Sequence, residues 1–445
     1  MTASGTLYTG WQRNLAFIWI GVFVGLMGAN FVFPFIPFYI KELGVTDDSR
    51  VAFYTGLTGS ATGLSLTLTA PLWGSLADRF GRKPMLVRAL IGAGILIGLM
   101  GLAQTVWHLV LLRFMMGAFA GTMGAAAALV AATTPRERTG RALGILQTGV
   151  FSANMLGPFI GGVVAASLGI RESFIFCAVL YIVASGLVLY FVKEPNSPRA
   201  SAAAAEAAGE RPAPAGNLVA NLREVLSEKQ ILVMLSFLFV LWLSTTFVRP
   251  VMPISVDGFA SHPDPADDSA DRVSLVLPGY QRELKEEAAT GIVFGILGLT
   301  STIAAISVSP VGERLGYRRT VCGAAMITGL LFLPVALAGG FTTFVLFLGG
   351  VGLFQGAMVP GTNALIAAAT PEGKHGSAFG LASSMQSLAL LIGPLAGGGV
   401  AGLFGIEAVY VVIGVILVGA AVLAFMSLHE PERGPIPEPA LHGPR

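Results

Sequence analysis

Long apolar runs separated by short polar segments dominate the chain. A membrane-spanning helix needs about 20 consecutive apolar residues. Twelve runs of this kind can be marked, at residues 14–40, 52–77, 84–104, 107–133, 141–168, 173–192, 230–253, 289–311, 318–338, 341–369, 377–403 and 407–428. They lack the regular apolar–polar alternation that is typical of a membrane β-barrel. The pattern therefore predicts an all-α membrane protein with twelve transmembrane helices.

The composition agrees with a chain whose main solvent is lipid. Of the 445 residues, 54% are hydrophobic and 12% are charged, whereas soluble domains carry roughly 25% charged residues. This excludes a disordered chain and a soluble multi-domain enzyme. Cys177 and Cys322 both lie in apolar runs, so we expect no disulfide framework. No basic run resembles a nucleic-acid-binding patch.

The sequence also lacks a recognisable catalytic motif. Gly92-Ala-Gly94 lies inside an apolar run without the strand and helix that surround a dinucleotide-binding loop, and there is no Walker loop. We therefore expect a protein that is not an enzyme and has no cofactor and no metal site. Any transport would be driven by an ion gradient or would run downhill.

The distribution of Lys and Arg predicts the orientation in the membrane. If both termini are cytoplasmic, 19 of the 27 Lys and Arg residues fall in inner segments and 6 in outer loops. The remaining two, Arg113 and Arg249, lie within spans. We expect a multi-pass protein of the inner (plasma) membrane with both termini in the cytoplasm.

A polar segment at 193–229, rich in Pro, Ala and charged residues, predicts a cytoplasmic linker between six-helix halves at 1–192 and 230–445. The halves repeat each other. Gly157-Pro158 recurs as Gly393-Pro394, and the segment that starts at Asp78 recurs as Glu313-Arg314-Leu315-Gly316. Two repeated six-helix halves are typical of a transporter with its substrate path between them.

Three motifs resemble those of a known family. Residues 74–83, read Gly-Ser-Leu-Ala-Asp-Arg-Phe-Gly-Arg-Lys, resemble the loop signature of the major facilitator superfamily. The segment around Arg113 resembles that family's Arg-bearing motif, and residues 144–161 resemble the antiporter signature of its twelve-helix drug:proton antiporter group. Gln104, Trp107 and Arg113 further resemble the MdtG-type multidrug exporters.

The resemblance implies a secondary active transporter that expels small-molecule drugs by proton-coupled alternating access, as in antibiotic resistance. Its partners would be the substrate, protons and the lipid bilayer, with no nucleic acid, and it would act as a monomer. The alternative is a facilitator or symporter of a physiological organic anion or sugar-like metabolite. A non-transporting receptor is disfavoured because both loop motifs are retained.

Ten residues are candidates for gating and conformational change. At the predicted inner end of its helix, Asp78 could meet the positive N-terminus of the helix that starts near Ser377, and Glu313 could act likewise in the second half. Glycine and proline would permit tight turns, close helix contact and bending. The candidates are Asp78, Arg79, Gly81, Arg82, Glu313, Arg314, Gly157, Pro158, Gly393 and Pro394.

Charge within the spans is limited to the two arginines, because all 25 carboxylates lie outside the middle of a span. Many proton-driven exporters carry an acid in the first helix, where this chain offers only Asn30. Asp78 and Arg113 are therefore the candidate coupling residues. His108 is the alternative titrating group, although an interfacial position is the simpler interpretation.

Polar residues within spans could line a substrate cavity or join helices. The candidates for the cavity are Asn30, Gln147, Asn154, Arg249, Gln355 and Asn363. A positive field from Arg113 and Arg249 would suit neutral or anionic substrates, unless Arg249 extends to the outer surface. Phe31, Phe33, Phe35 and Phe38 could form an aromatic wall or face lipid, and residues 254–288 are expected to be a solvated outer loop.

Overall fold

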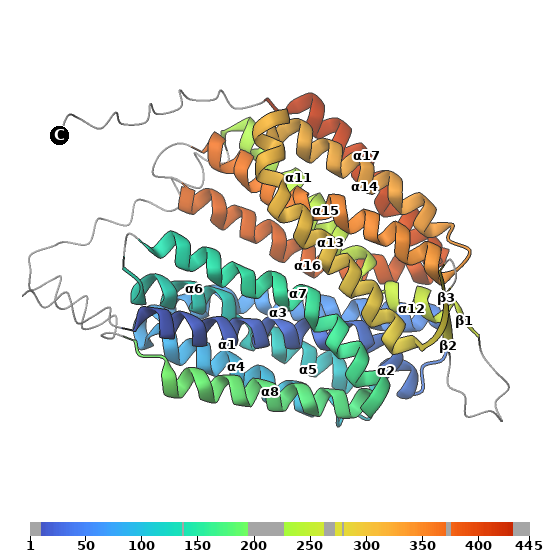
Figure 1. The fold of residues 1–445 in the computed structure, drawn as a ribbon, viewed down its shortest axis with the longest axis horizontal. Coiled ribbons are helices and arrows are strands. Elements are labelled where there is room, and N and C mark those ends of the chain that lie inside the picture. Colours follow the sequence, from blue (N-terminus) through green and yellow to red (C-terminus); the bar gives the residue numbers. More distant parts are fainter. Residues whose placement is uncertain are drawn as a thin grey trace, which may run out of the picture.

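The protein folds into two helical bundles that lie side by side (Figure 1). The computed structural model describes residues 10–135, 138–194, 227–261, 272–277, 280–370 and 375–429. Most of the predicted linker at 193–229 lies outside these ranges. We call the end of the bundles that carries strands β1–β3 the outer end, following the predicted topology, and the opposite end the inner end.

The first half carries the spans predicted between residues 14 and 192. The first span is broken, rather than continuous, because Pro34 and Pro37 cannot continue the helical hydrogen-bond pattern. The fourth span breaks before Gly121, whose φ of 117° suits glycine. The elements are α1 (Trp11–Val32), η1 (Phe33–Phe35), α2 (Ile36–Glu42), α3 (Asp48–Phe80), α4 (Arg82–Met100), α5 (Val106–Phe119), α6 (Thr122–Thr133), α7 (Thr139–Leu168) and α8 (Ile170–Phe191).

The second half repeats this order, including the break in its first span at Pro250 and Pro253. Its other spans are continuous, although three of the helices contain proline in addition to the Pro394 repeat. The helices are α11 (Lys229–Val248), α12 (Met252–Asp257), α13 (Glu286–Leu315), α14 (Tyr317–Ala336), α15 (Phe341–Ala369), α16 (His375–Phe404) and α17 (Ile406–Ser427).

The prediction of twelve spans in two halves is confirmed. Within the described residues, eleven segments are long and apolar enough to cross a membrane. The remaining predicted span, 52–77, lies in α3, which is 33 residues long and packs along α16 and α5. Helices α1–α8 form one bundle and α11–α17 the other.

The outer segment at 254–288 is not simply a solvated loop. It contains a three-stranded antiparallel sheet of β1 (Ala260–Ser261), β2 (Arg272–Leu277) and β3 (Tyr280–Lys285). Apolar residues at alternate positions of β2 explain the strand, since Val273 pairs with Leu284 and is fully buried. The backbone N–H of Val276 donates to Thr342 Oγ1 (2.9 Å), which attaches the sheet to α15.

The halves meet at the outer end through backbone contacts at glycines. A Cβ atom added to Gly398 of α16 would lie 2.5 Å from the carbonyl oxygen of Ala52 on α3. One added to Gly162 of α7 would lie 2.9 Å from the Cα of Gly291 on α13. These pairs leave no room for side chains, so the outer parts of α3 and α16, and of α7 and α13, are closely packed.

Toward the inner end, α7 and α13 spread apart (Figure 1). The close glycine contacts between the halves fall in the outer parts of these helices, within the described residues. The structure therefore has the halves joined at the outer end, an inward-facing arrangement. The contacts predicted for Asp78 and Glu313 at the inner end would form in the opposite, outward-facing state and stay a prediction.

An ion pair adds to the outer contacts. Lys41 Nζ, at the end of α2, contacts the carboxylate of Asp257, at the end of α12, and also lies 3.0 Å from Asp48 Oδ1. Asp257 is only 7% exposed. Because α2 and α12 belong to different halves, this pair stabilises the closed outer end.

We expect Lys41→Met to open the outer end. Loss of the Lys41 partner of the buried Asp257 carboxylate should cost the closed state roughly 1–3 kcal/mol. An Ala52→Cys reporter should then react with a membrane-impermeant maleimide at least several-fold faster. Arg272→Gln, which removes the exposed pair between Arg272 and Glu283 within the sheet, is the matched control. Equal labelling rates in both backgrounds would contradict this role.

Candidate functional site

A hydrogen-bonded chain of polar residues connects the two halves near the breaks in their first spans. Arg249 follows α11, and its Nη2 donates to Asn30 Oδ1 of α1 (3.0 Å). Asn30 Nδ2 donates in turn to Asn154 Oδ1 of α7 (2.8 Å) and to Leu26 O (2.9 Å). Arg249 thus bonds inside the protein instead of extending to the outer surface. Three predicted cavity residues from separate elements are brought together here.

Phe33 links both embedded arginines. The guanidinium carbon of Arg113 on α5 lies 5.3 Å from the centroid of the Phe33 ring, and that of Arg249 lies 5.5 Å from it. Such distances permit cation–π attraction. All four phenylalanines predicted as a wall are buried within the protein instead of facing lipid, but Phe33 is the one placed against both cations.

Arg113 is buried with few partners. It is 3% exposed, and its Nη1 donates weakly to the sulfur of Met116 at 3.8 Å. Its Nε and Nη2 atoms have no hydrogen-bond partner among the described residues. Since both arginines face one ring, their charges lie within about 11 Å of each other, and their repulsion is on the order of 1.5 kcal/mol at an effective dielectric constant of about 20.

The other three predicted cavity residues lie outside the hydrogen-bonded chain. Gln355 Nε2 on α15 donates to Ser244 Oγ (3.3 Å) and Thr245 Oγ1 (3.1 Å), one turn before Arg249. Asn363 is half-buried, and its Oδ1 has no partner among the described residues. Gln147 is exposed on α7. Neither Asn363 nor Gln147 joins the hydrogen-bonded chain, so their part in a cavity stays a prediction.

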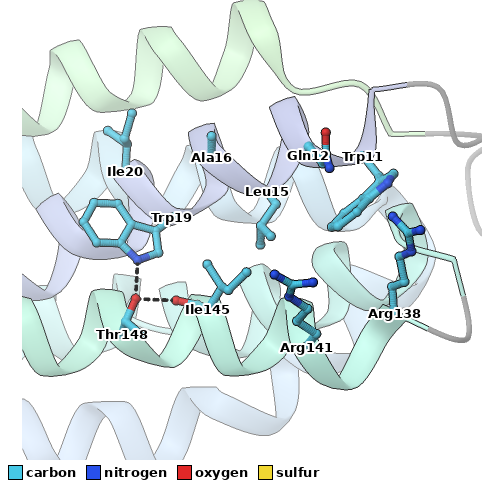
Figure 2. Close-up of a pocket in the computed structure, with 10 residues that line it drawn as sticks. All are labelled: Trp11, Gln12, Leu15, Ala16, Trp19, Ile20, Arg138, Arg141, Ile145 and Thr148. Atoms are coloured by element: carbon cyan, nitrogen blue, oxygen red, sulfur yellow. Dashed lines mark hydrogen bonds between the residues drawn. The ribbon is translucent and has the colours of Figure 1, made fainter.

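A pocket of about 660 Å³ opens between the inner ends of α1 and α7 (Figure 2). Trp19 Nε1 donates to Thr148 Oγ1 across it (3.0 Å), and the guanidinium carbon of Arg138 lies 5.8 Å from the ring of Trp11. The lining therefore combines cations with indole rings. It consists of Trp11, Gln12, Leu15, Ala16, Trp19, Ile20, Arg138, Arg141, Ile145 and Thr148.

The pocket and the arginine cluster lie along one face of α1. Gln12 and Asn30 are 18 residues apart, which is about five helical turns, so they face the same direction with a rise of about 27 Å between them. Trp19 and Phe23 fill the interval, with their rings stacked at a centroid distance of 5.3 Å. One face of α1 thus runs from the inner pocket to Asn30.

The loop between α3 and α4 is attached to the end of α8. Gly81 has a φ of 102°, which glycine adopts readily. The backbone N–H groups of Arg82 and Lys83 donate to the two carboxylate oxygens of Glu194 (2.9 and 3.0 Å). Glu194 therefore caps the N-terminus of α4. Sequence reasoning placed Glu194 in the linker, although an acid directly after the sixth span was a usable signal.

The remaining gating candidates divide into two groups. Glu313 and Arg314 are exposed at the inner end of α13, and the side chains of Asp78 and Arg79 lie outside the described part of the structure. In each Gly-Pro repeat the glycine lies at a contact within its own half, whereas Pro158 contacts Gly291 and Pro394 contacts Gly56 and Gly59 across the halves. Gly157 packs against the backbone of Met27 on α1, and Gly393 packs against Thr246 on α11. Pro158 and Pro394 lie inside α7 and α16.

Comparisons with known proteins agree on one family. The sequence matches the Major Facilitator Superfamily over residues 18–270 and 266–444. It is 31% identical to the multi-drug resistance efflux pump PmrA of Streptococcus pneumoniae, over 90% of this chain and 92% of that protein. It is 30% identical to the multidrug resistance protein MdtG of Enterobacter lignolyticus, over 94% and 93% of the two chains.

Solved structures share the fold at low sequence identity. The nucleoside transporter NupG superposes with a TM-score of 0.71 at 14% identity, over 93% of this chain and 98% of that one. A bacterial homologue of the lysosomal transporter Spinster, in an inward-facing and unoccupied conformation, also gives 0.71, at 13% identity and over 94% and 96% of the chains. These likenesses support the fold alone.

We expect Arg113→Met to stabilise the folded protein. The substitution removes a buried guanidinium with two unpartnered nitrogen atoms and leaves a side chain of similar length in an apolar site. Replacing buried charge by apolar groups is often stabilising by roughly 1–4 kcal/mol. The thermal unfolding midpoint in detergent should therefore rise, whereas Arg113→Lys should not raise it. A midpoint several degrees below that of the wild type would show that Arg113 is a structural donor.

Proposed function

The chain belongs to the major facilitator superfamily of membrane transporters, and we propose that it expels small amphipathic compounds by alternating access. The proposal is supported by its similarity to PmrA and MdtG, both named for multidrug resistance. In this proposal the protein acts as a monomer in the inner membrane with both termini in the cytoplasm. Substrate reaches the inner pocket from the cytoplasm or from the inner leaflet of the membrane.

The observation that carries the proposal is the position of the Arg249–Asn30 bond. It joins the halves between an outer end closed by packed glycines and an inner end where α7 and α13 spread apart. A substrate bound here is reached from one side only. Rocking the halves about this level would close the inner end and open the outer one.

Coupling to protons follows from the family resemblance and has to operate without an acid in the middle of a span. We propose that Asp78 carries the titratable charge, at the inner end of α3, and that Arg113 responds to the state of the cavity. In the outward-facing state the carboxylate of Asp78 meets the N-terminus of α16. Protonation weakens this contact and releases the inner end.

A proton gradient should drive substrate movement. In inverted vesicles or proteoliposomes that contain the purified protein, ethidium and the uncharged dye N-phenylnaphthylamine should accumulate when the lumen is acidified. Collapse of the gradient with nigericin should abolish accumulation of at least one of them. Flux that is indifferent to the gradient would contradict the antiporter and favour a facilitator.

We expect Asp78→Asn to lower gradient-driven accumulation at least tenfold while downhill exchange persists, because the variant lacks the charge that responds to pH. Asp47→Asn, at the exposed outer turn where Asp47 Oδ1 accepts from Arg50 N–H, is the control. Full activity of Asp78→Asn would exclude Asp78 as the coupling residue.

A further inference from the structure

We propose that Arg113 and Arg249 form a binding site for the anionic group of an amphipathic aromatic substrate, a carboxylate or a sulfonate. The substrate then supplies the negative charge that the spans lack. The inference rests on the proposed transport function and narrows its substrate class. It concerns the cluster of Arg113, Phe33, Asn30 and Arg249 in the inward-facing state.

Arg113 lacks the hydrogen-bond acceptors that its buried guanidinium group needs. A buried cation is costly unless a counter-charge or hydrogen-bond acceptors surround it. Arg113 is 97% buried, and its polar contacts among the described residues reach only the sulfur of Met116 and the ring of Phe33. Two of its three nitrogen atoms remain unpartnered. An incoming carboxylate or sulfonate offers the acceptors that the protein does not.

The elements around the cluster place no acidic side chain beside the two arginines among the described residues. The carboxylates on these elements lie at their ends, as with Glu42 of α2, Asp257 of α12 and Glu286 of α13. Asn30 and Asn154 contribute neutral amides. Like charges thus face one ring from two halves, so an anion placed between them replaces repulsion by attraction on both sides.

The face of α1 between the inner pocket and the cluster has a similar chemistry at both of its ends. The inner pocket pairs Arg138 with the ring of Trp11, and stacked Trp19 and Phe23 continue along the same face of α1. The cluster repeats this pairing as two guanidinium groups around Phe33. A molecule with an aromatic body and one anionic group meets suitable partners at both levels.

An inorganic anion such as chloride would also supply acceptors for the two arginines. The test therefore has to distinguish an organic anion from an inorganic one. Anilinonaphthalene sulfonate and N-phenylnaphthylamine share their aromatic body and differ in the sulfonate. Their binding to the purified full-length protein in lipid nanodiscs can be followed by fluorescence. Titrations in chloride and in gluconate at equal ionic strength form the second arm.

We expect the sulfonate to bind at least tenfold more tightly than the uncharged analogue. Arg113→Gln and Arg249→Gln should each remove most of this preference and change the affinity for the uncharged analogue less than threefold. Arg249→Lys should retain part of it. Arg171→Gln, which removes an exposed outer arginine beside Glu42, should behave as wild type. Thermal unfolding verifies that each variant is folded.

Three results would overturn the assignment. The first is equal affinity for the two probes, and the second is an equal loss of affinity for both probes in the arginine variants. The third is displacement of the sulfonate probe by chloride at a concentration close to that of the protein, which would identify an inorganic occupant. Transport of the uncharged analogue by the wild type separates this inference from the proposed function. If that analogue is expelled and the arginine variants keep the wild-type preference for the sulfonate, the exporter stands and the anion site fails.

Discussion

The structure depends on the cost of placing charge where there is no water. Two charged side chains, Arg113 and Arg249, lie within the spans, and among the described residues neither contacts a carboxylate. Phe33, Asn30 and the sulfur of Met116 supply only partial compensation. Such a cluster is suited to a ligand that supplies the missing negative charge and hydrogen-bond acceptors. Binding of that ligand gains the interactions that the folded protein does not provide for the two guanidinium groups.

Close packing of small residues decides which end is closed. Glycine pairs such as Gly162 and Gly291 bring backbones of opposite halves into contact near the outer end, where side chains would hold them apart. The pair of Lys41 and Asp257 adds charge attraction at the same level. These contacts can break without disturbing either bundle, because each bundle keeps its own helix contacts, such as Gly157 of α7 with α1 and Gly393 of α16 with α11.

Much of the fold could be read from the sequence because the bilayer imposes length and polarity on each span. The spans, the repeat and the two embedded arginines all follow from local composition. Local reasoning was less successful where a residue acts on a distant one. Phe33 stood among four similar phenylalanines, and Glu194 was assigned to the linker although it caps α4. The sheet at 260–285 was expected to be a loop, because its strands are short and lie among charged residues.

The sequence by itself determined that this is a membrane transporter of repeated halves, with cationic and no anionic charge inside its spans. Those properties depend on which residues occur in each apolar run, and the chain order records them directly. Only the tertiary structure decided that Arg113 and Arg249 face one ring, that Asn30 joins Arg249 across the halves, and that the outer end is closed. These depend on how helices far apart in sequence cross, and crossing is set by packing between surfaces that no single run contains.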